Sequence, residues 1–154
     1  MQRRTFLKGT IATSTLAIVV SAGMLSPRTV LAAWPKSAFE AKTVEDALNS
    51  LLGNAQTTPS ADIKIKAPDI AENGAVVPVT ITTSITGIES ISIVAMKNGN
   101  PLAANFIMTN NTKGFISTRI KMGKTSDVVA IVKAGGKSHA ARKNIKVTIG
   151  GCGG

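Results

Sequence analysis

The sequence predicts an all-β protein, an immunoglobulin-like antiparallel β-sandwich of about seven strands that follows one short N-terminal helix. Apolar residues recur at helical spacing once in the chain. Short runs of β-branched residues alternating with polar ones come next, and Gly, Asn and Pro turn signals separate them. A chain of 154 residues with one cysteine and one histidine cannot close an intramolecular disulfide or build a Cys/His zinc site, so its aliphatic core must stabilise one domain.

Residues 1–32 have the pattern of a cleaved signal peptide. The segment Arg3-Arg4-Thr5-Phe6-Leu7-Lys8 resembles a twin-arginine motif, and residues 9–23 carry no charge. This apolar stretch is shorter than the roughly 20 residues that span a bilayer, and Val30-Leu31-Ala32 fits a small-x-small cleavage site. We therefore predict export to the periplasm by the twin-arginine route, without stable membrane insertion.

The basic balance of the chain changes once this segment is removed. Four of the 18 basic residues lie within residues 1–32, so the formal net charge falls from +10 to +6. The remaining lysines are spread along the chain, and with no Tyr, one Trp and four Phe there is little for bases to stack on. Nucleic acid is therefore not predicted as a partner.

Residues 33–60 are predicted to form an N-terminal helix and a polar connector. Within residues 36–52, six apolar residues fall largely on one helical face: Phe39, Val44, Ala47, Leu48, Leu51 and Leu52. Thr43 and Asp46 have the spacing of a capping box, and Gly53 is placed to end the helix.

The β-sandwich is predicted to occupy residues 61–149, where the period of the apolar residues changes to two. Because the strands alternate, we expect one face of each sheet to meet water. The predicted strands are residues 63–66, 76–83, 90–96, 105–108, 115–122, 128–133 and 145–149.

The last five residues are Gly150, Gly151, Cys152, Gly153 and Gly154. They contain no apolar anchor, and glycine loses more conformational freedom on ordering than any other residue, so we predict a flexible arm. Fully extended, the arm would reach roughly 16–18 Å and would be thin enough for a narrow enzyme channel. The thiol of Cys152 is therefore predicted to be a covalent attachment point for cargo.

The surroundings of Cys152 in the sequence do not favour self-activation. A nucleophilic cysteine needs a helix N-terminus, a neighbouring cation or a second cysteine to lower its pKa, and none of these is near Cys152 in sequence. We therefore predict a protein on which enzymes act and that is not itself an enzyme. No catalytic residue, metal site or cofactor is predicted.

Three other functions remain open from the residues alone. An exported immunoglobulin-like interaction module could use an exposed Cys152 for an intermolecular disulfide. A carrier could instead activate the carboxylate of Gly154 as a thiocarboxylate, although that chemistry needs ATP-dependent adenylation. A simple adhesion or ligand-binding sandwich has no use for the glycine-cysteine tail.

Several segments together resemble the SoxY family, the sulfur-carrier subunit of the periplasmic thiosulfate-oxidising (Sox) multienzyme system. The similar segments are the terminal Gly-Gly-Cys-Gly-Gly with residues 144–149 before it, residues 67–79, residues 118–122 and the twin-arginine signal. One departure is the turn at residues 98–101, Asn-Gly-Asn-Pro, which is longer than the family pattern leads us to expect.

The resemblance implies partners and chemistry. It implies a heterodimer with SoxZ, a second immunoglobulin-like subunit. It also implies that Cys152 holds sulfur from thiosulfate as a cysteine S-thiosulfonate or persulfide. The implied enzymes, which dock transiently, are the c-type cytochrome SoxXA and the dimanganese hydrolase SoxB. The sulfane sulfur that remains is then handled either by the molybdenum–haem dehydrogenase SoxCD or by transfer to a sulfur store.

Other polar residues have less specific interpretations. His139 is interpreted as a solvated surface residue, and Glu72-Asn73-Gly74 as a turn, since Asn and Gly tolerate positive φ. Arg142, Lys143 and Lys146 precede the arm and either steer it toward acidic partners or form a solvated strand face.

Overall fold

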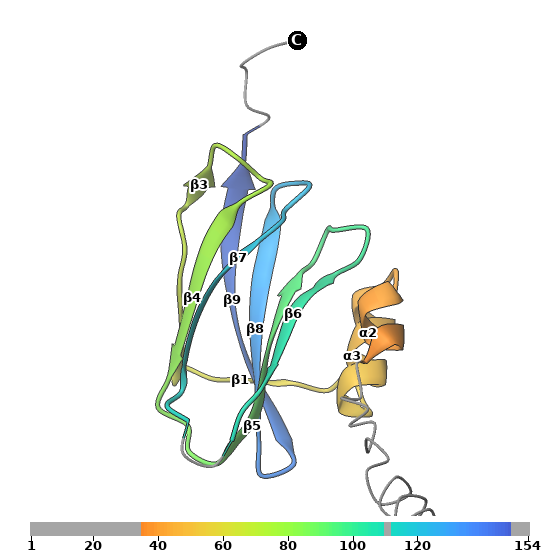
Figure 1. Ribbon diagram of the computed structural model, residues 1–154, viewed down its shortest axis with the longest axis vertical. Helices are drawn as coiled ribbons and strands as arrows, with labels where there is room; N and C mark the ends of the chain where they lie inside the picture. The colour runs from red at the N-terminus through yellow and green to blue at the C-terminus, as the bar shows by residue number, and fades with distance from the viewer. Residues whose placement is uncertain (1–34, 110–111, 149–154) are drawn as a thin grey trace, which may run out of the picture. The chain divides into compact units, whose positions relative to one another are not determined.

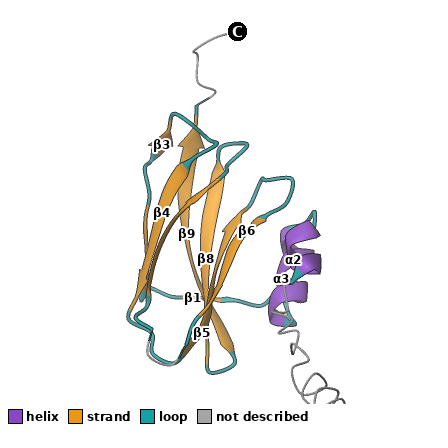
Figure 2. Ribbon diagram, in the orientation of Figure 1, coloured by secondary structure: helices purple, strands orange, loops and turns teal. Residues whose placement is uncertain are grey.

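In this computed structural model, residues 35–109 and 112–148 are described. They form a β-sandwich with two short helices on one side (Figures 1 and 2). The predicted signal peptide at residues 1–32 and the arm at residues 150–154 lie outside the described residues. The predicted fold class, an immunoglobulin-like sandwich, is confirmed.

The strands form two sheets. The larger has the order β1-β9-β8-β5-β6 with β3 also pairing with β9, and the smaller has the order β2-β4-β7. The bounds are β1 Thr58–Pro59, β2 Ile63–Lys66, β3 Ile70–Ala71, β4 Val77–Thr83, β5 Ile88–Ala95, β6 Leu102–Ile107, β7 Phe115–Ile120, β8 Ser126–Ala134 and β9 Lys137–Val147.

The core between the sheets follows from strand alternation. In β4, Val77, Val79 and Ile81 are fully buried while the residues between them are not. They belong to the same buried cluster as Ile91 and Ile93 of β5 in the other sheet. Alternation of apolar and polar residues therefore turns the apolar side chains of both sheets toward one shared core.

The helical segment is two helices, so the prediction of one continuous helix over residues 36–52 is wrong. Helix α2 is Lys36–Glu40 and α3 is Val44–Leu52. The chain is extended at Ala41 (ψ 141°), and the Thr43 hydroxyl accepts a hydrogen bond from the Asp46 N–H at 3.1 Å. The predicted cap thus starts a new helix, and Gly53 ends it in the left-handed conformation at φ 82°.

The two helices cover the outer face of the large sheet. Ala47 and Leu48 of α3 share a second buried cluster with Val129 and Ile131 of β8, which point away from the sandwich core. Strands β5 and β8 are consequently buried on both faces. The expectation that one face of each sheet meets water is wrong for this sheet.

All seven predicted strands are present, but the last one is longer than predicted. β9 begins at Lys137, eight residues before the predicted start at residue 145. The two-residue strands β1 and β3 were not predicted, and both run parallel to β9 along its outer edge. The other strand pairs described are antiparallel.

Candidate functional site

The predicted attachment residue Cys152 and the arm residues Gly150, Gly151, Gly153 and Gly154 lie outside the described residues. The structure defines the place from which they extend. Strand β9 ends at Val147, and Thr148 is the last described residue, four positions before Cys152. We call the end of β9 and the loops around it the arm root.

Strand β3 holds the arm root on its outer side. It pairs in parallel with the end of β9, and the Lys146 N–H donates to the Asp69 carbonyl at 2.9 Å. The Thr148 N–H donates to the Ala71 carbonyl at 3.1 Å, and the Thr148 hydroxyl donates to the same oxygen at 3.4 Å. The backbone is therefore fixed up to the last described residue.

Thr125 holds the arm root on the opposite side. Pairing of β8 with β9 starts at Ser126 opposite Ile145, so no strand residue of β8 lies opposite Val147. The Thr125 hydroxyl takes that place, because it accepts from the Val147 N–H at 2.9 Å and donates to the Val147 carbonyl at 3.3 Å. A side chain thus completes the sheet one step beyond the end of β8.

The turn at Glu72-Asn73-Gly74 packs against this end of the sandwich. The Asn73 side chain accepts from the Ala75 N–H at 2.9 Å, which confirms the predicted turn. Gly74 does not have positive φ, so that reason for the glycine is wrong. A Cβ at Gly74 would collide with the Met122 carbonyl oxygen and lie 2.8 Å from Val147 Cγ1, so the close approach to the arm root requires glycine.

The basic residues on β9 divide into paired and exposed ones. The Lys143 ammonium forms an ion pair with Asp69 at 2.9 Å and donates to the Ala67 carbonyl at 2.7 Å. It holds the segment leading into β3, so neither a steering role nor a solvated strand face describes Lys143. Arg142 and Lys146 are exposed.

A surface hollow of about 470 Å³ lies at the arm root. It is lined by the 72–75 turn, the 121–123 loop and residues 147–148. Val147 and Thr148, the last residues that the structure describes, are therefore part of its wall.

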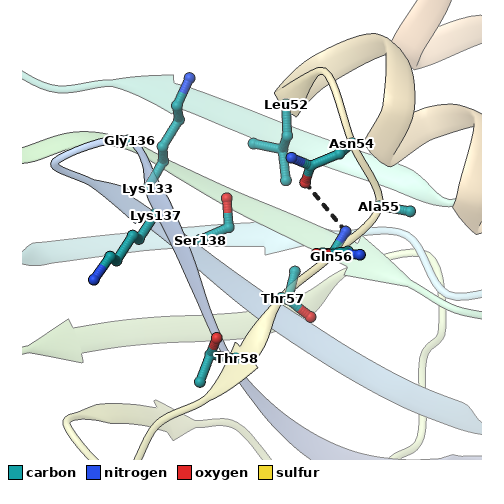
Figure 3. Close-up of a pocket in the computed structure, with 10 residues that line it drawn as sticks. All are labelled: Leu52, Asn54, Ala55, Gln56, Thr57, Thr58, Lys133, Gly136, Lys137 and Ser138. Carbon is teal, nitrogen blue, oxygen red and sulfur yellow. Dashed lines mark hydrogen bonds between the residues drawn. The ribbon is translucent and has the colours of Figure 1, made fainter.

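A second hollow lies at the other end of β9 (Figure 3). It has a volume of about 590 Å³ and lies between residues 52–58 and the β8–β9 hairpin, where Lys137 and Ser138 begin β9. Ten strand steps separate Lys137 from Val147, roughly 33 Å, whereas the four residues from Thr148 to Cys152 span at most about 14 Å. Cys152 of the same chain cannot reach this hollow.

The described residues contain no group of three or more His, Cys, Asp or Glu side chains that could hold a metal ion. His139 is half-buried on β9, opposite Thr58 of β1, so it is not fully solvated as interpreted from the sequence. In the part of the chain that the structure describes, no helix is long and apolar enough to cross a membrane.

Comparison with known proteins identifies a family and a solved structure of high similarity. The family model "Sulfur oxidation protein SoxY" matches residues 48–152. The sulfur carrier protein SoxY from Chlorobium limicola f thiosulfatophilum is 44% identical, with a TM-score of 0.63 over 70% of this chain and 97% of that chain. No curated protein matches the sequence.

Two other solved structures share much less with the chain. A chain from a structural study of T cell specificity and activation by the bacterial superantigen toxic shock syndrome toxin-1 is 10% identical over 56% of this chain and 99% of that chain, with a TM-score of 0.41. The BSP domain of a biofilm-associated protein is 13% identical over 58% of this chain and 16% of that chain, with a TM-score of 0.39. Neither carries an argument about function.

Proposed function

The chain belongs to the SoxY family of sulfur oxidation proteins, and from that premise we propose that it is a covalent sulfur carrier whose cargo is attached to the thiol of Cys152. The observation that carries the proposal is the extent of the family match, which runs through residue 152. Cys152 is the only cysteine among 154 residues, so a sulfur cargo held on a thiol has one place to be attached.

The chemistry of loading is an oxidation. The Cys152 thiol and the sulfane sulfur of thiosulfate form an S–S bond, giving Cys–S–S–SO₃⁻ and releasing two electrons and the thiol proton. The electrons need an acceptor outside this chain, which we propose to be a c-type cytochrome, SoxXA. Water then cleaves the bond between the sulfane sulfur and the sulfonate, a reaction we assign to the hydrolase SoxB. The products are sulfate, two protons and a persulfide anion on Cys152.

The hydrogen bonds at the arm root are consistent with a carrier role, because they fix the base of the arm. Hydrogen bonds from Thr148 to Ala71 and between Val147 and Thr125 fix both sides of β9 at its end. A carrier must present its cargo without loosening its own fold, and this double attachment isolates the sandwich from forces on the residues beyond it. The domain can then stay outside a partner while residues 150–154 enter.

The remaining predicted partners and location follow the same proposal. We propose a heterodimer with SoxZ, transient docking to SoxCD where the persulfide is oxidised further, and a periplasmic location reached by the twin-arginine route. We also propose that the protein has no cofactor of its own and no catalytic residue, since each chemical step is assigned to a partner.

The proposal is tested in cells that depend on this chain for thiosulfate oxidation. The substitution Cys152→Ser replaces only the sulfur atom with oxygen, and we expect thiosulfate consumption to stop. The control, Lys113→Gln, changes an exposed residue of the sandwich and keeps both the arm and the thiol, and we expect it to retain the activity. Activity in Cys152→Ser would contradict the proposal and favour the Gly154 carboxylate. A protein recovered only as a disulfide dimer during turnover would favour the interaction module.

A further inference from the structure

A third hollow, of about 640 Å³, adjoins the one at the arm root. Its lining comes from the 97–100 loop between β5 and β6 and from the 121–124 loop between β7 and β8. Lys121 and Gly123 line both hollows, so the two lie side by side. Pairing of Ala95 with Val128 and of Ser126 with Ile145 places the 97–100 loop at the same end of the sandwich as the end of β9 (Figure 1).

The loops that form this third hollow are held together by side-chain amides. Asn98 donates from Nδ2 to the Lys121 carbonyl at 2.7 Å, and its Oδ1 accepts from the Gly123 N–H at 3.0 Å. Asn100 donates to the Phe39 carbonyl at 2.8 Å and accepts from the Lys42 ammonium at 3.1 Å. These hydrogen bonds hold the two loops to each other and to the helical segment, so the hollow is part of the folded structure.

The charged residues that line the third hollow are all basic. Lys97, Lys121 and Lys124 line it, and no acidic residue does. Among the described residues, none of these three lysines has an ion pair or a side-chain hydrogen bond. Glu72, which lines the arm-root hollow, is the one acidic residue that lines either of these two hollows. Three unpaired ammonium groups around one hollow are suited to an oxyanion.

We propose that this lysine hollow, defined by Lys97, Lys121 and Lys124, binds the sulfonate group of the cargo carried on this chain's own arm. The inference rests on the proposed function, since the cargo supplies the anion. Thr148 and Lys121 line the same hollow, so the chain has to cross only that hollow. The four residues from Thr148 to Cys152 can span about 14 Å, compared with about 5 Å between neighbouring strands.

The contact between the sulfonate and the lysines is weak, so the arm can rest there and still be released easily. Ion pairs at an exposed surface are weak and are screened by salt, so a free sulfonate would bind poorly. A short tether raises its effective concentration to roughly the millimolar range, which favours docking without new contacts. The unloaded thiol has no sulfonate and loses the attraction. The position of the arm therefore depends on its cargo.

The test uses the purified full chain with its one cysteine loaded chemically. Tetrathionate serves as the reagent: the thiolate attacks one of its central sulfur atoms, an S–S bond forms as the central S–S bond breaks, thiosulfate leaves, and Cys–S–S–SO₃⁻ results. Iodoacetamide gives the matched control, an arm capped with a neutral group. The readout is the amide chemical shifts of residues 97–100 and 121–124 in ¹H–¹⁵N spectra.

We expect these shifts to differ between the loaded and capped proteins, and the difference to decrease as NaCl is added. The variant Lys97→Gln/Lys121→Gln/Lys124→Gln should lose the difference. The control Lys64→Gln/Lys66→Gln/Lys113→Gln removes the same charge from residues that line neither hollow and should keep it. Identical loaded and capped spectra in the two loops, or equal loss in both variants, would overturn the inference. Because loading is chemical, these results do not depend on thiosulfate oxidation in cells, where the proposed function is tested separately.

Discussion

The hydroxyl of Thr125 takes the position of a missing strand residue opposite Val147, accepting from its N–H at 2.9 Å and donating to its carbonyl at 3.3 Å. Because β8 pairs with β9 only from Ser126, this side chain determines how far the sheet extends toward Cys152. With β3 on the other side, it sets Thr148 as the fixed base of the proposed arm.

Replacing Thr125→Val keeps the shape of the side chain and removes both hydrogen bonds. We expect a loss of about 1 kcal/mol in the free energy of unfolding and faster hydrogen exchange at the Val147 amide. The control is Thr80→Val, which removes an exposed hydroxyl pair with Ser117. Exchange at Val147 that is equally slow in wild type and Thr125→Val would show that the hydroxyl does not hold the arm root.

Gly74→Ala tests the close approach of the 72–75 turn to β9. The added methyl group would collide with the Met122 carbonyl and Val147 Cγ1, so we expect a loss of about 1–3 kcal/mol in urea denaturation. Gly99→Ala is the control, because nothing lies within 4 Å of a Cβ there. It should leave the stability unchanged or raise it by up to about 1 kcal/mol. Equal stability of the two variants would contradict this account of the turn.

Lys143→Met removes both contacts of the ammonium group, the ion pair with Asp69 and the hydrogen bond to the Ala67 carbonyl. Asp69→Asn removes only the ion pair, whose carboxylate is 90% exposed. We expect less than about 0.5 kcal/mol of destabilisation for Asp69→Asn and about 1 kcal/mol for Lys143→Met. Only the effect of Asp69→Asn should disappear at high salt. Two equal, fully salt-sensitive losses would show that the Ala67 contact contributes nothing.

Leu48→Ala tests the packing of the helical segment on the large sheet. Leu48 is 7% exposed and shares a buried cluster with Val129 and Ile131, so we expect a loss of about 2–5 kcal/mol in urea denaturation. Leu52, at the end of α3, is only partly buried, so Leu52→Ala should lower the free energy of unfolding by clearly less. A Leu48→Ala variant no less stable than Leu52→Ala would mean that the helices contribute little to the sandwich.

Local chemistry made much of the fold predictable from the sequence. Thr43 and Gly53 marked the limits of α3 through side-chain capping and positive φ, and alternation located β2 and β4. The start of β9 was missed because residues 137–144 are mostly polar and lie toward the sheet edge, where no apolar alternation is required. β1 and β3 were missed because two-residue strands depend on β9 and have no pattern of their own.

The burial of β8 on both of its faces could have been predicted from the sequence. Residues 128–132 read Val-Val-Ala-Ile-Val, an uninterrupted apolar run typical of a strand covered on both faces. The lysine hollow had no such signal, because Lys97 and Lys121 are far apart in the sequence and only the topology brings their loops together. Cys152 could be selected from the sequence alone because it is the only thiol.

The most direct test of the carrier assignment is the intact mass of the protein recovered from cells that are oxidising thiosulfate, followed by peptide mapping. We predict a fraction of the protein heavier by one thiosulfate unit and another heavier by one sulfur atom, with both additions on Cys152. Recovery of an unmodified Cys152 throughout turnover, or of these additions at another residue, would contradict the assignment.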